Sequence, residues 1–289
     1  MLVKNKILIS SLLLFFCLLA SSASAFSISP LKYTISIDPG KNKELVVSVT
    51  NDSNIEKEYQ ATVIGVQQDE KGRPVFKSNS DIAESWVKFN SEKIVLKSNE
   101  EKDFVFTITI PKNTPPGAHY VGLGVKEITE QNIGSQLVTI LVLQVAGTAN
   151  ESLILEKFYS ISNYFFNKNL LYFLEVKNSG NIDLSMTAQM ETYNFQNQMI
   201  DSQSVNLGNR IFAQSKRSVE IKSAVSDKMF WPGKYYSMMI VNYGLTNQQI
   251  IGSANFWYWP VWFLFSVGVV VVGLLSVLIY RKKKHEAVE

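Results

Sequence analysis

An uncharged apolar run at residues 261–280, close to the carboxyl end, is the feature that most constrains this chain. At about 1.5 Å of rise per residue, a helix over this run spans the roughly 30 Å of hydrocarbon in a bilayer. Aromatic residues crowd its front edge, where amphipathic rings favour the lipid headgroup layer, and basic residues follow at 281–284. We therefore predict an aromatic belt and a single transmembrane helix at 256–280, and a basic tail at 281–289 in the cytoplasm.

The amino end has the layout of a secretory signal peptide. Lys4 and Lys6 precede an uncharged apolar stretch, and small residues at 23–25 suit signal peptidase. This layout predicts a signal peptide at 1–25 that is cleaved before Phe26. The chain would then sit in the plasma membrane with its N-terminal domains outside the cell. An uncleaved anchor is the alternative, which the short run and the cleavage site disfavour.

The single cysteine, Cys17, lies inside this apolar stretch. Phe15 and Phe16 precede it, where a lipoprotein signal needs small residues, so we do not expect lipidation. The mature chain is therefore predicted to contain neither disulfides nor thiolate metal sites.

Between the two ends, apolar and polar residues alternate. Runs such as 28–37, 45–49, 59–63 and 104–110 alternate and are rich in β-branched and aromatic residues, which is typical of half-buried strands. Turn-forming residues separate these runs, and no convincing amphipathic helix precedes residue 256. The apolar run 137–145 is too short for a helical span and predicts a strand buried on both faces.

Two parts of the chain resemble each other. The segment VSVTNDSNIEKEYQATV, which begins at Val47, aligns without gaps with LEVKNSGNIDLSMTAQM, which begins at Leu174. This alignment pairs Asn51 with Asn178, and five of its seventeen positions are identical. Further along, a Pro-Gly pair followed by a tyrosine occurs in both copies in the same order, at 116–120 and 232–236. These two similarities indicate an internal duplication. An extra hairpin around 70–76 would account for the greater length of the first copy.

Each copy is about the size of an immunoglobulin-like β-sandwich. We therefore predict an all-β fold, with two tandem immunoglobulin-like β-sandwiches followed by the single transmembrane α-helix. The first domain is placed at 26–150 and the second at 151–255.

The segments SPLKYTISIDPG, VTNDS, FTITIPKNTPPGAHYVGLGV and VKNSGNID, together with Trp86, resemble bacterial surface proteins related to the WxL-interacting proteins. The resemblance covers nearly the whole chain and rests on turns and core positions. It implies a signal peptide, two immunoglobulin-like domains, one carboxyl-terminal span and a basic tail. It also implies that the first domain contacts peptidoglycan and the second contacts host or partner proteins. The loops depart from the best-known members, which leaves the ligands open.

No sequence pattern in the ectodomain points to catalysis or metal binding. Its one histidine, His119, follows a Pro-Gly turn and is predicted to be structural. A nucleophile elbow and zinc-ligand pairs are missing from the sequence, and Asp69-Glu70 lacks the further ligands of a calcium loop. Only a glycosidase-type pair among the scattered carboxylates stays open. We predict that the chain is not an enzyme and has no catalytic, cofactor-binding or metal residues and no cofactor.

Charge argues against a nucleic-acid partner. The chain has 28 basic and 25 acidic residues, and the basic excess lies at the two ends. The predicted ectodomain is therefore close to neutral and lacks the basic footprint of a nucleic-acid binder.

Because catalysis, metal binding and nucleic-acid binding are not predicted, we expect the protein to act by binding a partner through its surface. Rings can stack on sugars or anchor a protein partner, although most are expected in the core. The candidates are Trp86, Tyr164, Phe165, Phe166, Tyr193, Phe195, Phe230 and Trp231. We predict a membrane-anchored extracellular binding, adhesion or scaffold protein that contacts a cell-wall polymer such as peptidoglycan, or other envelope and surface proteins. The alternative is a membrane-tethered chaperone for the assembly of exported surface proteins. A third hypothesis is an accessory subunit that makes its contacts through the helix.

Overall fold

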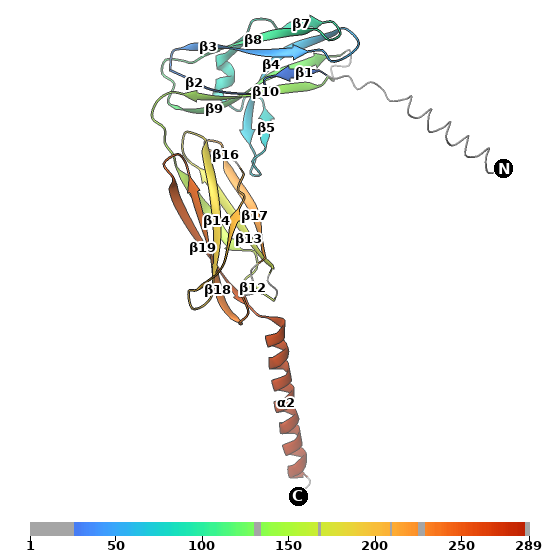
Figure 1. The fold of residues 1–289 in the computed structure, drawn as a ribbon, viewed down its shortest axis with the longest axis vertical. Coiled ribbons are helices and arrows are strands. Elements are labelled where there is room, and N and C mark those ends of the chain that lie inside the picture. Colours follow the sequence, from blue (N-terminus) through green and yellow to red (C-terminus); the bar gives the residue numbers. More distant parts are fainter. Residues whose placement is uncertain (1–25, 130–133, 167–168, 209, 225–228, 287–289) are drawn as a thin grey trace, which may run out of the picture. The chain divides into compact units, whose positions relative to one another are not determined.

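The computed structural model describes residues 26–129, 134–166, 169–208, 210–224 and 229–286. The predicted signal peptide and Cys17 lie outside these residues. The described chain consists of β-strands followed by one apolar helix, α2 (Val261–Glu286), which confirms the predicted fold class (Figure 1). Strands β1–β10 build the first sandwich and strands β11–β19 build the second.

The first sandwich pairs a four-stranded sheet with a six-stranded one. The smaller sheet has the order β1 (Ser27–Ser29), β3 (Asn42–Thr50), β8 (Glu101–Thr109), β6 (Val87–Phe89). The larger has the order β2 (Lys32–Ile37), β10 (Gln136–Val145), β9 (Gly117–Ile128), β4 (Lys57–Gln68), β5 (Pro74–Lys77), with β7 (Lys93–Leu96) also on β4. A short 3-10 helix, η1 (Ile82–Trp86), precedes β6.

Period-two alternation explains the core of this sandwich. In β3 and β8, every second residue points inward, so that Val47, Val49, Phe104 and Phe106 are completely buried. Each such side chain contributes roughly 1.5–3 kcal/mol through burial. Strand β10 is the buried strand predicted at 137–145, and the β4–β5 hairpin is the predicted insertion near 70–76.

The second sandwich repeats this arrangement. Its smaller sheet has the order β11 (Leu153–Ser160), β13 (Asn169–Asn178), β17 (Lys216–Ala224). The larger has the order β12 (Tyr164–Phe165), β19 (Gln248–Tyr258), β18 (Gly233–Tyr243), β14 (Leu184–Tyr193), β15 (Met199–Val205), with β16 (Arg210–Ile211) also on β14. Rings from both sheets meet in one core, in which Tyr172 packs edge-on against Phe256.

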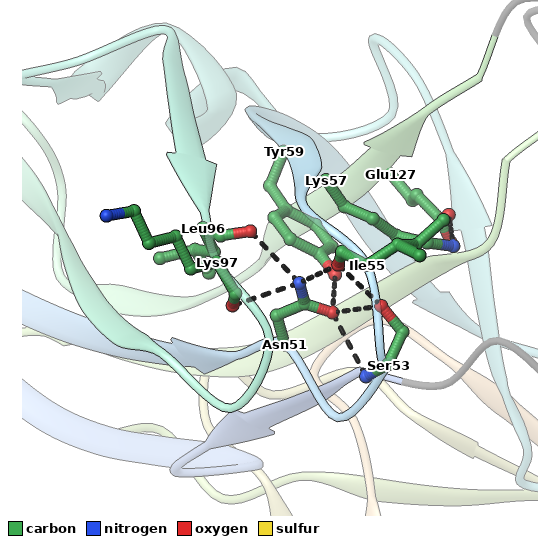
Figure 2. A network of polar contacts seen from close by, with 8 residues as sticks. All are labelled: Asn51, Ser53, Ile55, Lys57, Tyr59, Leu96, Lys97 and Glu127. Carbon is green, nitrogen blue, oxygen red and sulfur yellow. Dashed lines mark hydrogen bonds and ion pairs between the residues drawn. The ribbon is translucent and has the colours of Figure 1, made fainter.

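Asn51, at the end of β3, organises the turn into β4 (Figure 2). Its buried side-chain amide donates hydrogen bonds to the backbone carbonyls of Ile55 (2.8 Å), Leu96 (3.0 Å) and Lys97 (3.1 Å). Its Oδ1 accepts from the backbone N–H of Ser53 at 3.1 Å. Asn51 therefore links the β3–β4 turn to the end of β7, a strand that comes much later in the sequence.

Asn178 does the same in the second sandwich. Its amide donates to the carbonyls of Ile182 (2.8 Å), Ile211 (3.2 Å) and Phe212 (3.1 Å), and its Oδ1 accepts from Gly180 N–H at 2.9 Å. These four bonds match four of the bonds of Asn51, including the one to the isoleucine four residues downstream. The two asparagines that the sequence alignment pairs thus hold equivalent turns in the two sandwiches.

Three details differ from expectation. Gly117 and Gly233 open strands β9 and β18 and do not form turns; Gly117 has no positive φ, whereas Gly233 has a φ of +157°, a conformation that L side chains rarely adopt. The apolar residues of 28–37 form two strands in different sheets, because the chain changes sheets at Pro30. Strand β19 runs to Tyr258, so that residues 256–258 of the predicted belt belong to the second sandwich.

Candidate binding surfaces

Two buried carboxylates form ion pairs, and the buried Arg217 guanidinium donates to the backbone carbonyls of Leu207 and Arg210. Glu127 forms an ion pair with Lys57 inside the first sandwich (Figure 2). Glu175 in the second sandwich pairs with Lys157 at 3.1 Å between Nζ and Oε1. Among the residues that the structure describes, no group of three or more His, Cys, Asp or Glu side chains could hold a metal ion. His119 is half-buried in β9. These ionisable groups lie within strands of the two sandwiches.

Tyr59, next to this ion pair, gives the first sandwich a predicted sensitivity to alkali. Burial raises the pKa of Tyr59 to about 12, and the negative charges of Glu127 and Asp52 add to the shift. The folded chain thus holds the phenolic proton more tightly than the unfolded chain. The resulting stability is complete below the ordinary pKa of 10.0 and is lost as the pH rises towards about 12.

We expect the melting temperature of the wild type to fall more steeply than that of Tyr59→Phe above about pH 10. The variant loses the hydrogen bond to Asn51 Oδ1 (3.1 Å) and starts from a lower stability, but it has no phenol to titrate. Thermal unfolding of both proteins from neutral to alkaline pH measures the difference. Parallel curves would show that Tyr59 titrates alike in the folded and unfolded chains.

The aromatic candidates named from the sequence divide into two groups. Trp86 and Phe165 are buried, and Tyr193 is half-buried with its ring stacked on Tyr236. The exposed ones are Tyr164, Phe166, Phe195, Phe230 and Trp231. The expectation that most of these rings are core is wrong for this set. All the exposed candidates belong to the second sandwich.

Strand β2 is an open edge of the first sandwich. Within the part of the chain that the structure describes, it lies at the end of its sheet and pairs only with β10. It is six residues long and has one charged residue, Lys32, at its start. The Tyr33 hydroxyl fixes the strand by donating to the carbonyl of Val46 at 2.7 Å. An edge of this kind offers a row of free backbone groups to another extended chain.

The outward row can be assigned from one hydrogen bond. The carbonyl of Leu31 accepts from the N–H of Ile140 in β10 at 3.0 Å. Because backbone groups point to alternate sides along a strand, those of Tyr33 and Ile35 also face β10. The N–H and C=O groups of Thr34 and Ser36 therefore face away from the sheet.

The other edge strands have features that prevent pairing with another chain. Strand β17 contains Lys216, Arg217, Glu220 and Lys222. Strand β11 contains a register shift between Leu155 and Lys157, and the β14–β15 pairing shifts between Thr192 and Tyr193, beside Met199 in the edge strand β15. Strands β1, β5 and β6 are only three or four residues long. Charges, bulges and shortness all discourage edge-to-edge association, so β2 is the least protected of these edges.

Sequence reasoning did not single out β2, since residues 28–37 read as one continuous strand. Pro30 was the available signal, because proline cannot donate to a sheet ladder and is found at edges and breaks.

Comparison with known proteins gives structural likeness only. No protein-family model and no curated protein matches the chain. A chain of the chaperone–tip adhesin complex of CFA/I fimbriae biogenesis has a TM-score of 0.45 and 12% identity, covering 80% of this chain and 99% of its own. The class 5 fimbriae chaperone CfaA has a TM-score of 0.41 and 12% identity, covering 82% and 100%. The E. coli chaperone DraB has a TM-score of 0.40 and 12% identity, covering 79% and 96%. At TM-scores this low, such likeness assigns neither a family nor a function.

Proposed function

We propose that this chain is a membrane-anchored protein of the cell exterior that binds other exported proteins, without catalysis, by pairing an extended segment with strand β2. The observation that carries the proposal is the open, nearly uncharged β2 edge beside better-protected edges. Main-chain hydrogen bonds supply affinity in strand addition, and side chains on alternate positions supply specificity.

The helix supplies the anchor. Residues Val261–Arg281 are long and apolar enough to cross a membrane, and 0% of this stretch is buried against the rest of the described chain. The basic residues at 281–284 favour a cytoplasmic tail, which leaves both sandwiches outside the plasma membrane. The binding surface would then be held close to the site where proteins leave the export machinery.

Two kinds of protein partner fit an open edge. A mature surface protein with an extended tail would make the chain a scaffold or adhesin, as in the WxL-interacting-like reading. An unassembled protein that still lacks a strand would make it a tethered chaperone. The edge favours the chaperone, because an incompletely folded sandwich needs the hydrogen bonds that β2 offers. Binding to a wall polymer would instead use exposed rings such as Phe195 and Trp231 in the second sandwich.

The substitution Thr34→Pro tests the proposal. It removes the outward N–H of residue 34 while leaving the β10 side of the strand intact, since proline is tolerated at edges whose N–H faces solvent. Thr34→Ala is the matched control, because it shortens the same exposed side chain and keeps the N–H. We expect Thr34→Pro to weaken capture of exported proteins from an envelope extract at least about tenfold, equivalent to about 1.4 kcal/mol, and Thr34→Ala to capture like the wild type.

The identity of the captured proteins separates the two readings. Unassembled subunits support the chaperone, whereas mature surface proteins support the scaffold. Equal capture by Thr34→Pro and Thr34→Ala would contradict binding through β2. Binding of purified peptidoglycan by both variants would favour the polymer reading, and partners cleaved in a protein-dependent way would overturn the absence of catalysis.

A further inference from the structure

Most exposed rings of the second sandwich gather at one end. Strand β19 ends at Tyr258 and α2 begins at Val261, so this end is joined to the helix by only two residues. The exposed rings nearest this junction are Tyr164, Phe166, Phe195, Phe230, Trp231 and Trp257. We call this group the collar.

Strand register places the collar residues together. Tyr164 pairs with Trp257, and Gly233 pairs with Tyr258, at the end of β19 next to the helix. Tyr193 pairs with Tyr236, so the β14–β15 turn that carries Phe195 lies at this same end. Three loops that are distant in sequence therefore converge where the helix begins.

Ring contacts connect the collar to the helix. Phe230 stacks on Trp262, in the first turn of α2, with ring centroids 5.1 Å apart. Trp231 meets the same indole edge-on at 6.1 Å. Despite these contacts, Phe230 and Trp231 are 51% and 60% exposed. They therefore present large apolar area beside the residue at which the apolar span starts.

The opposite end of the sandwich is different. Its turns carry Asn181 and Asp183, and Glu151 accepts hydrogen bonds from Leu245 and Thr246 N–H. Leu245 is exposed there, and within the described parts of β11–β19 no exposed ring lies at that end. The asymmetry matches a domain with one end in water and the other at a lipid surface.

We infer that the collar is a membrane-docking surface, which rests the end of the second sandwich in the headgroup layer of the bilayer that α2 spans. Tyrosine and tryptophan favour this layer because their rings are apolar at one end and polar at the other. Exposed Lys222 and Lys234 lie at the same end, within reach of lipid phosphates. Phe195, Trp231 and Tyr235, with neighbouring amides, also line a hollow of about 570 Å³ that could take a headgroup.

This inference rests on the proposed membrane anchoring and goes beyond it. An anchor alone would let the sandwich tilt freely on its two-residue connection. A docked collar would hold the second sandwich at a fixed height and orientation relative to the membrane. A protein partner on the collar is the competing occupant. The ring contacts with Trp262 and the two-residue connection to α2 favour lipid as the occupant. Both hold the collar at the depth of the membrane–water interface.

Single cysteines carrying an environment-sensitive fluorophore test the inference in the full chain. Cys17→Ser supplies a cysteine-free background, and vesicles of phosphatidylcholine and phosphatidylglycerol supply the membrane. Labels go on Phe195→Cys and Phe230→Cys in the collar, Leu245→Cys at the opposite end, and Val271→Cys within the helix. All four wild-type side chains are exposed, so that the replacements leave the core intact.

We expect the labels at 195, 230 and 271 to shift to the blue and to be quenched by lipid-borne nitroxides, and the label at 245 to be quenched only from water. Collar labels that behave like the label at 245, while 271 is in lipid, would overturn docking and leave the anchor standing. Collar labels shielded from both quenchers would show a protein occupant and also overturn docking. A label at 271 in water would contradict the anchor itself.

Discussion

Replacing Asn178 with alanine should lower the free energy of unfolding of the second sandwich by about 3 kcal/mol or more, and Asn51→Ala should do the same to the first. Each substitution leaves three backbone carbonyls without the donor that the asparagine amide provides, and a turn N–H without its acceptor. An unsatisfied buried polar group costs about 1–3 kcal/mol, and partial relaxation keeps the total below the simple sum.

Asn42→Ala is the matched control, since Asn42 opens the same strand, β3, with an exposed side chain. Its substitution should change stability by less than about 0.5 kcal/mol. Denaturant unfolding measures the size of each effect, and hydrogen exchange read by mass spectrometry shows which sandwich is affected. A loss at Asn51 or Asn178 no larger than that at Asn42, or a loss shared by both sandwiches, would contradict the role of these asparagines as turn anchors.

Truncation after Trp259 should move the protein from the membrane fraction to the soluble fraction almost completely. The deleted segment contains the one described helix that is long and apolar enough to cross a membrane, whereas the sandwiches keep their own core residues. Burial of a span of about 20 apolar residues is effectively irreversible, and aromatic docking of the collar alone is not.

Fractionation after a carbonate wash measures this change, because the wash removes proteins that are bound only at the surface. Replacing Lys282, Lys283 and Lys284 with glutamine is the control. This variant keeps the apolar run, so it should stay in the membrane, with a weaker preference for a cytoplasmic tail. Truncated protein that resists the wash would show that another part of the chain holds the membrane.

The features predicted from the sequence are those set by local pattern. Alternation marked the strands, and an uninterrupted apolar run marked α2. The alignment of Asn51 with Asn178 identified the repeat because the two side chains perform the same task in both copies. Few other side chains can donate to three backbone carbonyls from a buried position. The asparagine is therefore identical in the two copies even though most neighbouring residues differ.

The features missed depend on contacts between distant segments. The collar brings together loops near 164, 195 and 230, and no local pattern records that they share one end of a sandwich. The expected turns at Gly117 and Gly233 are strand starts, because a Pro-Gly pair also suits the entry to a strand. The open edge of β2 follows from sheet order, which a change of sheet at Pro30 determines.

Photo-crosslinking from Ser36 in living cells tests the central claim, that the chain binds exported proteins through β2, most directly. Ser36 is exposed on the outward row of β2, and Ser204, exposed on β15 in the second sandwich, is the control position. A photoreactive residue at 36 is predicted to give discrete adducts with exported proteins, and these adducts should disappear when Thr34→Pro is added. Adducts of equal yield from 36 and 204, or adducts at 36 that survive Thr34→Pro, would contradict the claim.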